Sequence, residues 1–117
     1  MTTSTHQDCL FCKIVRKEIP ADVVFEDDQV LAFRDIAPKA PTHILLVPKR
    51  HVARLSDATP ADEPLLGRLV FVLTGVARQL GLDDYRVVIN SGAGAGQVVF
   101  HIHVHLMAGR RFSWPAG

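Results

Sequence analysis

His101-Ile102-His103-Val104-His105-Leu106-Met107 is the most informative stretch of the chain. Polar and apolar residues alternate strictly along it, and a period of two is typical of a β-strand. We therefore expect a strand over Val99–Met107 whose three imidazoles share one face, with neighbours about 6.6 to 7 Å apart. Ile102, Val104 and Leu106 are then predicted to face the core.

Two kinds of site use a row of imidazoles, and a third reading is that they are ordinary polar residues on a wet sheet face. A metal centre needs its donors within about 2.0 to 2.1 Å of one ion, and three rings along a straight strand converge poorly. In phosphoryl transfer, one neutral imidazole attacks phosphorus while its other nitrogen donates a hydrogen bond. Flanking imidazoles then hold phosphate oxygens and pass protons. The central position, His103, is favoured for attack.

A glycine-rich loop, Ser91–Gln97, leads directly into this segment. Glycines let backbone N–H groups approach an anion closely, although such turns also join strands without binding anything. No Gly-Lys-Ser or Gly-Lys-Thr follows, so the loop does not predict a P-loop ATPase. Its position before the histidines favours a phosphate-binding role.

The remaining segments predict the rest of an α+β fold. Short apolar runs rich in β-forming residues predict strands over Val23–Phe25, Val30–Phe33, His43–Val47 and Tyr85–Asn90. With the histidine strand they make a five-stranded antiparallel sheet, and Glu26-Asp27-Asp28 supplies a hairpin turn.

Two helices complete the prediction. A long helix over Pro60–Leu80 keeps apolar residues at spacings of three and four, with Thr59 as its cap and Gly81 as its stop. A short helix within Cys9–Lys17 ends before Pro20.

Length and composition narrow the class of protein. The chain has 117 residues, 48% of them hydrophobic and 21% charged, with a net charge of +1. This predicts one folded domain over residues 9–117, preceded by a flexible tail over residues 1–8. The charge does not favour nucleic-acid binding, and no apolar run reaches the roughly 20 residues of a membrane span. Without a secretory signal, the expected location is the cytoplasm.

The segment from Gly96 to Met107 resembles the signature of the histidine triad (HIT) superfamily. Further matches resemble its Hint branch and extend from about residue 9 to the C-terminus. They are Phe11-Cys12-Lys13-Ile14, Ile19-Pro20, Phe25–Asp28, Ala32–Ile36, Pro41-Thr42-His43, Val47-Pro48-Lys49, Gly109-Arg110, Trp114-Pro115 and Gly117.

This resemblance implies the HIT-like fold, a homodimer with a ten-stranded sheet, and a phosphoramidase. The substrates would be purine nucleoside monophosphate derivatives, whose P–N bond is cleaved through a nucleotidyl-histidine on His103. By the same match, His105 contacts the phosphate and assists proton transfer, His101 supports the hydrogen-bond network, and His43 is a fourth histidine near the site.

The resemblance also assigns residues to nucleotide binding. Asp35 would receive the ribose hydroxyls, since an ionised carboxylate only accepts hydrogen bonds. The base slot would comprise Phe11, Ile14, Phe33 and Ile36, and the phosphate loop Asn90, Gly96 and Gln97. Without the resemblance, Phe33 and Ile36 read equally well as core residues and Asp35 as a turn residue.

Cys9 and Cys12 form a second candidate site. Their spacing supplies half of a tetrahedral zinc site, and two histidines would have to complete it. The resemblance points to His51 and His101 as those ligands. Such a zinc would be structural, and catalysis itself would need no cofactor; the alternative is a pair of reduced, partly buried thiols.

The chain departs from the family pattern at one position of the site. Many relatives carry Ser where this chain has Val98, so a hydroxyl that could assist amine departure is missing.

Two other functions remain open as hypotheses. One alternative function is a nucleotide-binding interaction module with incidental turnover. Another is a metal-dependent hydrolase that uses the histidine row as ligands.

Overall fold

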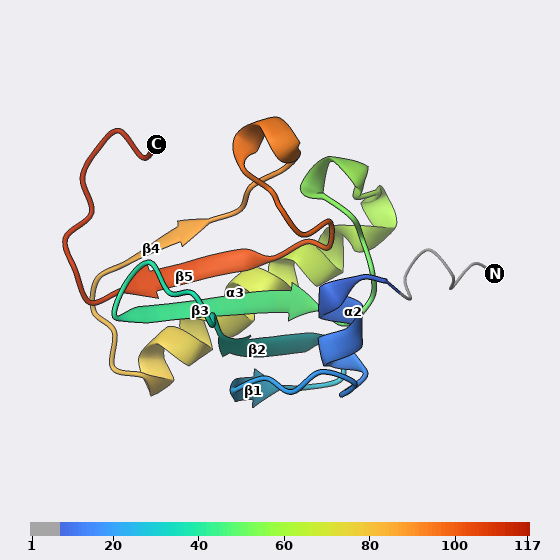
Figure 1. The fold of residues 1–117 in the computed structure, drawn as a ribbon, viewed down its shortest axis with the longest axis horizontal. Helices are drawn as coiled ribbons and strands as arrows, with labels where there is room; N and C mark the ends of the chain where they lie inside the picture. The colour runs from blue at the N-terminus through green and yellow to red at the C-terminus, as the bar shows by residue number, and fades with distance from the viewer. Residues whose placement is uncertain (1–7) are drawn as a thin grey trace.

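The structure, a computed structural model, describes residues 8–117, so nearly all of the predicted tail over residues 1–8 lies outside the described residues. It confirms the predicted α+β fold (Figure 1). One five-stranded antiparallel sheet has the strand order β1-β2-β3-β5-β4. The elements are α2 (Leu10–Val15), β1 (Val23–Glu26), β2 (Val30–Arg34), β3 (Thr42–Pro48), α3 (Glu63–Gln79), β4 (Tyr85–Val88) and β5 (Val104–Ala108), with short 3₁₀ turns at Leu55–Asp57, Pro60–Asp62 and Ala93–Ala95.

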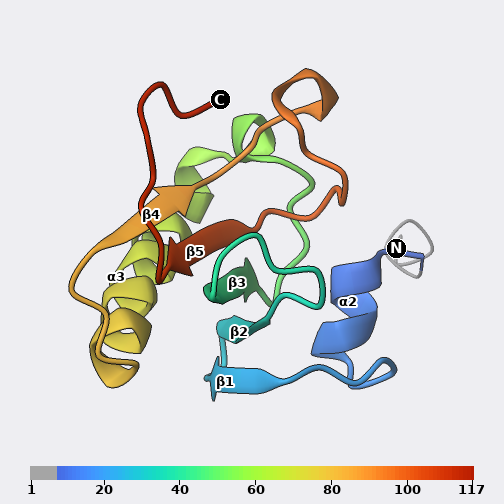
Figure 2. The same ribbon diagram turned by 60° about the vertical axis from the view of Figure 1, so that its left-hand side comes forward.

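The two faces of the sheet are covered by different helices (Figure 2). Because side chains alternate along β3, Ile44 and Leu46 pack with α3 in one core cluster. Leu45 and Val47 face the other way and pack with Phe11 of α2. The sheet therefore has a face closed by the long helix α3 and a face only partly covered by the short helix α2. Among the described residues, no helix has both the length and the apolar character that crossing a membrane requires.

The fifth strand begins later than predicted. Its ladder with β3 starts at Val104, opposite Leu46, and β3 itself ends at Pro48. The preceding residues are held instead by isolated bonds, such as the one from the Ile102 N–H to the Val52 carbonyl oxygen at 2.8 Å. The inward side of the alternation is correct, since Ile102, Val104 and Leu106 all lie in the α3 core cluster. The fourth strand also stops short, at Val88 rather than Asn90.

The long helix also begins later than predicted, at Glu63 rather than Pro60. Its first turn is a separate 3₁₀ turn, closed by a capping box in which Thr59 and Asp62 satisfy each other's backbone N–H groups. Asp62 is buried and is also paired with Arg50. At the other end Gly81 adopts a φ of 71°, which is the left-handed stop expected there.

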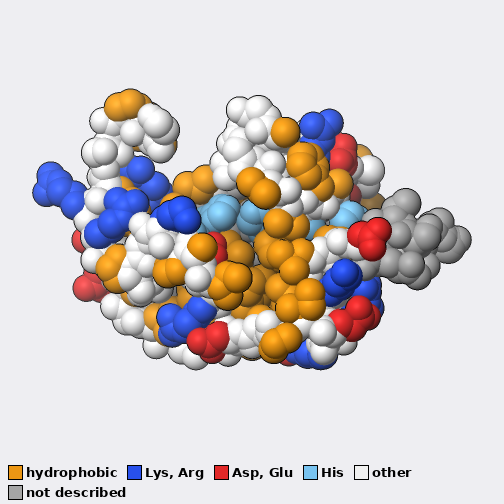
Figure 3. Space-filling model, viewed as in Figure 1, with side chains coloured by type: hydrophobic (Ala, Val, Ile, Leu, Met, Phe, Trp, Pro, Cys, Tyr) orange, Lys and Arg blue, Asp and Glu red, His pale blue; other side chains and the backbone are white. Residues whose placement is uncertain are grey.

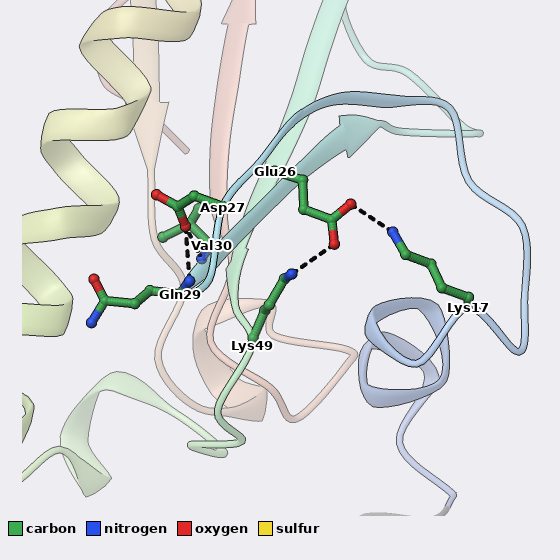
Figure 4. Close-up of polar contacts among 6 residues, drawn as sticks. All are labelled: Lys17, Glu26, Asp27, Gln29, Val30 and Lys49. Carbon is green, nitrogen blue, oxygen red and sulfur yellow. Dashed lines mark hydrogen bonds and ion pairs between the residues drawn. The ribbon is translucent and has the colours of Figure 1, made fainter.

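Charged side chains form ion pairs between the segment after α2, the strand β1 and the end of β3 (Figure 4). Glu26 accepts hydrogen bonds from Lys17 Nζ at 2.7 Å and from Lys49 Nζ at 2.6 Å. It thereby links the segment after α2 to β1 and to the residue that follows β3. The predicted acidic hairpin turn is present, because Asp27 Oδ1 accepts from the N–H groups of Gln29 and Val30 at 2.8 and 2.7 Å.

Candidate functional site

A cleft of about 460 Å³ lies on the sheet face opposite α3. Apolar side chains fill the middle of this face, and histidines line its upper edge (Figure 3). Its lining includes nine of the ten residues predicted to contact a nucleotide: Phe11, Ile14, Phe33, Asp35, Ile36, Asn90, Gly96, His103 and His105. The structure thus gathers residues from α2, β2, β5 and two loops around one hollow.

His103 has a fixed tautomer in this cleft. Its Nδ1 lies 2.8 Å from the backbone carbonyl oxygen of His101, which can only accept, so Nδ1 carries the proton. The lone pair is therefore on Nε2. Phe11 packs edge-on against the ring at 5.0 Å between centroids and holds its orientation. The side chain is buried apart from its cleft-facing part, as an in-line nucleophile requires.

His105 and His43 form a directed hydrogen-bond chain beside it. The Lys39 N–H donates to His43 Nδ1 at 3.0 Å, so neutral His43 carries its proton on Nε2. That Nε2–H donates to His105 Nδ1 at 2.9 Å, which leaves the proton of neutral His105 on Nε2. The rings of His103 and His105 lie 4.9 Å apart. One ring thus offers a lone pair and its neighbour a proton.

Burial sets the charge state of this pair. Burial, reinforced by the neighbouring His103 and His43, lowers the pKa of His105 to about 4. Burial also lowers the pKa of His43, against the opposing attraction of Asp35, whose Oδ2 lies 3.5 Å from His43 Nε2. Without a ligand both rings are neutral near pH 7. A bound phosphate anion would favour their protonated forms.

Asp35, His43 and His105 also bring three donor atoms within 4.8 Å of one another, as a metal site would. The hydrogen bonds argue against that use. A metal ligand needs a lone pair on His43 Nε2, but the Lys39 N–H already occupies the lone pair of Nδ1 and forces the proton onto Nε2. This disfavours the reading of the row as the centre of a metal-dependent hydrolase.

The four predicted zinc ligands, in contrast, come together as a compact group. His101 Nδ1 lies 3.4 Å from Cys9 Sγ, 3.5 Å from Cys12 Sγ and 3.2 Å from His51 Nδ1. His51 Nδ1 lies 3.3 Å from Cys12 Sγ. A tetrahedron built with zinc bond lengths has edges of about 3.3 Å between two nitrogens and about 3.5 Å between nitrogen and sulfur. The donor set and its spacing therefore fit a zinc ion.

Two further features suit these residues to a cation. His101 Nε2 donates to the Pro48 carbonyl oxygen at 2.7 Å, which leaves Nδ1 as the lone-pair atom facing the sulfurs. Burial, together with the adjacent Cys9, raises the pKa of the Cys12 thiol to about 12. In the absence of a cation the thiol therefore keeps its proton, whereas coordination to zinc would remove it.

Gln97 does not line the cleft; its side chain instead holds the shape of the glycine-rich loop. The buried Gln97 side chain accepts from the Gly92 N–H at 2.8 Å and donates to the Ala53 carbonyl oxygen at 2.8 Å. Gly92 and Gly96 adopt φ values of 97° and 98°, where only glycine is unstrained. Of the predicted phosphate loop, Asn90 and Gly96 line the cleft while Gln97 holds its shape.

The sequence did not single out Lys39, whose N–H donates to His43 Nδ1 in the candidate site. The predicted loop Ala37–Pro41 is present, but its pattern of prolines says nothing about which N–H faces a histidine. The sequence signal that could have found it is the position of His43 four residues later, at the start of a strand.

The family model for the HIT domain matches residues 16–112. Among curated proteins, the chain is 54% identical over 112 residues to an uncharacterized HIT-like protein of Synechocystis, covering 95% of this chain and 98% of that protein. It is 53% identical over 111 residues to a maize "14 kDa zinc-binding protein", covering 92% and 87%.

Solved structures agree with these sequence matches. A HIT family hydrolase from Legionella pneumophila superposes with a TM-score of 0.91 at 50% identity, covering 94% of this chain and 100% of that one. A histidine triad nucleotide-binding protein from Candida albicans superposes with a TM-score of 0.81 at 34% identity, covering 94% and 85%. With the family model, the fold and the histidine row all in agreement, the chain belongs to the HIT family.

Proposed function

We propose that the chain is a phosphoramidase of the Hint branch, which hydrolyses the P–N bond of purine nucleoside phosphoramidates through a nucleotidyl-histidine on His103. The observation that carries this proposal is the hydrogen bond from His103 Nδ1 to the His101 carbonyl oxygen. It fixes the lone pair on Nε2 in a cleft large enough for a nucleotide.

The cleft offers a distinct place for each part of such a substrate. The base enters the apolar part, which Phe11, Ile14 and Phe33 line. Ile36 is fully exposed at the rim, and covering it with a base would remove an unfavourable contact with water. Asp35 Oδ1 accepts the Ala37 N–H, and the carboxylate keeps further acceptor capacity for ribose hydroxyls. The phosphate then lies beside the glycine-rich loop.

The reaction follows from the two fixed tautomers. His103 Nε2 attacks phosphorus and the P–N bond breaks. The bound phosphate draws a proton onto the His43–His105 pair, and His105 Nε2–H delivers a proton to the leaving nitrogen, so the amine departs neutral. Water then attacks the nucleotidyl-histidine and returns a proton to the pair. When the nucleoside monophosphate leaves, the pair gives up this proton to solvent, which supplied the first one, and is neutral again. His103 Nε2 regains its lone pair, so atoms and protons balance over the cycle.

The relatives lend coarse support to this proposal. The Legionella structure is named a hydrolase and the Candida structure a nucleotide-binding protein. The maize relative is named zinc-binding. We accordingly propose a structural zinc held by Cys9, Cys12, His51 and His101. Neither cysteine is in a disulfide, which suits a reducing compartment such as the cytoplasm.

We further propose the homodimer with a ten-stranded sheet. β4 is an edge strand, and Tyr85 and Val87 on it are exposed. An edge with unpaired backbone groups and exposed apolar side chains is a ready template for a second copy. The association state in solution, measured by light scattering, tests this part independently of catalysis.

Mass spectrometry of protein quenched during turnover of an adenosine phosphoramidate tests the central claim. We expect an added nucleotidyl mass on the peptide that contains His103, and its absence in His103→Ala. Tight AMP binding with negligible hydrolysis would instead support the interaction module with incidental turnover. Label on another residue would contradict the assignment of the nucleophile.

A further inference from the structure

A second pocket, of about 450 Å³, lies near the histidine end of the cleft and is strongly cationic. Its lining comprises Asp84, Tyr85, Arg86, Arg110, Arg111 and Phe112. Three guanidinium groups against one carboxylate leave it positive. None of the ion pairs found among residues 8–117 involves these three arginines. Within that part of the chain, no acidic side chain therefore forms an ion pair that would neutralise their charges.

The sheet register places this pocket on the catalytic face. Arg86 of β4 lies directly opposite Met107 of β5, and Val88 lies opposite His105. Residues directly opposite each other in an antiparallel pair share a face, so Arg86 is the diagonal neighbour of His105, about 7 to 8 Å away. Lys and Arg side chains gather beside the pale-blue histidines on this face of the molecule (Figure 3).

Backbone contacts hold the guanidinium groups there. Arg110 Nε donates to the Lys39 carbonyl oxygen at 2.9 Å, and Lys39 also lines the cleft. Arg86 donates to the Ser113 carbonyl oxygen at 2.9 Å. The ring of Phe112 lies under both, 4.2 Å from Arg110 Cζ and 5.2 Å from Arg86 Cζ. Among the described residues, Arg86 and Arg110 are thus held by carbonyl oxygens and an aromatic ring rather than by an acidic side chain.

The chain approaches itself closely at this point because of one glycine. Gly109 has a φ of 97°, and a Cβ built on it would lie 2.8 Å from the Cβ of Pro41. No other residue fits there without displacing the loop. Gly109 therefore brings Arg110 against the loop that carries Lys39 and precedes His43.

We propose that Arg86, Arg110 and Arg111 form a leaving-group subsite, and that the enzyme prefers phosphoramidates whose amine carries an anionic group a few atoms from the scissile nitrogen. This inference rests on the proposed function. The bond cleaved and the proton balance are unchanged: the amine leaves neutral at nitrogen and keeps its carboxylate or phosphate. Only the second-order rate constant differs between leaving groups.

The expected size of the preference follows from the distance. A unit charge at about 7 Å in a water-like medium changes a rate constant about threefold, and salt screens it. Three guanidinium groups less the Asp84 carboxylate leave two net charges, which give about a tenfold preference at low salt. The preference should shrink towards about twofold when the ionic strength approaches 0.5 M.

The test compares kcat/KM for four adenosine phosphoramidates with matched amines: β-alanine, β-alaninamide, ethylenediamine and O-phosphoethanolamine. We expect the carboxylate probe to exceed the neutral amide about tenfold, and the cationic probe to fall below it. The phosphate probe separates the two anion types, because a larger advantage than that of the carboxylate would identify a phosphorylated amine as the better match.

Variants link the preference to the pocket. Arg110→Gln and Arg111→Gln should each lower the carboxylate-to-amide ratio of kcat/KM about threefold, and the ratio cancels any effect that the substitution has on both substrates alike. Arg78→Gln is the matched control, since Arg78 is exposed on α3, on the opposite side of the sheet. It removes the same charge and should leave the ratio unchanged.

The outcomes separate this inference from the proposed function. Failure to hydrolyse any of the four probes would contradict the phosphoramidase itself. Hydrolysis of the amide with no advantage for either anionic probe would overturn the leaving-group subsite and leave the phosphoramidase standing. An advantage that survives both arginine substitutions would also overturn it.

Discussion

The two ends of the histidine row contain the same residue type in very different surroundings. At one end, His101 is fully buried, with one ring nitrogen against two sulfurs and another imidazole and the other on a carbonyl oxygen. At the other end, His103 and His105 line an open cleft. The difference teaches that the partner of each ring nitrogen, rather than the motif, determines whether an imidazole suits binding a cation, attacking phosphorus or moving a proton.

Removing the central ring should have the largest effect. His103→Ala should lower turnover of an adenosine phosphoramidate by at least about 10⁴-fold, since no neighbouring group can replace a covalent nucleophile. AMP affinity, measured by calorimetry, should change little because the base and ribose contacts remain. Wild-type turnover in this variant would contradict the assignment of His103 as the nucleophile.

Removing one proposed zinc ligand, at the buried end of the row, should lower stability rather than turnover. Cys12→Ser should abolish zinc binding, measured by elemental analysis, and lower Tm by about 10 °C, which corresponds to about 2 kcal/mol in a domain of this size. A chelator should lower the Tm of the wild type and leave that of the variant unchanged. If chelation leaves the wild-type Tm where it was, the cluster is a pair of reduced thiols packed against two imidazoles.

The hydrogen bond from His43 to His105, in the cleft, should contribute less to turnover than the nucleophile does. His43→Gln removes the ring that orients His105, and we expect turnover to fall about 10- to 100-fold. Zinc content should be unaffected, because His43 is not among the four cluster residues. A loss below threefold would show that His105 needs no such partner.

Acid should destabilise the folded protein through protonation of His105, at the cleft end of the row. Its folded-state pKa of about 4 lies below the ordinary value of 6.5, so between these pH values the unfolded chain binds more protons than the folded one. The free energy of unfolding should therefore fall as the pH drops from 6.5 to 4. Urea titrations across this range should show a shallower fall in His105→Gln than in the wild type.

The smallest effect is expected at the rim. Val98 is 86% exposed and lines the cleft. Val98→Ser should raise turnover of poor amine leaving groups about two- to fivefold, because a hydroxyl there can donate a hydrogen bond to the departing nitrogen. An unchanged rate would indicate that His105 alone serves the leaving group.

Much of the fold follows from local patterns that carry their own physics. The apolar spacing of α3 and the alternation of the strands reflect burial on one face, which a sequence records directly. The start of β5 cannot be read from such a pattern, because a strand forms only where a neighbouring strand pairs with it. The neighbour, β3, ends at Pro48, and the residues from His101 to His103 carry no sign of that.

The candidate site shows the same division. Side-chain chemistry marked His103, His105, Cys9 and Cys12 in advance. The backbone groups that set their tautomers, namely the Lys39 N–H and the carbonyl oxygens of His101 and Pro48, have no sequence signature, since every residue has them. Likewise, the family resemblance placed Gln97 in the phosphate loop, but nothing in the sequence indicated that its side chain bonds to the Gly92 N–H and to the Ala53 carbonyl oxygen.

The contact between Gly109 and Pro41 has a consequence for protein engineering. It fixes where the chain leaves the sheet, so the residues after it start from a constant point beside the reacting atoms. A C-terminal segment of different composition, grafted from Arg110 onwards with Gly109 retained, should therefore alter which amines are accepted without disturbing the histidines. In such chimeras the histidines would stay as they are, and only the segment that contacts the leaving amine would change.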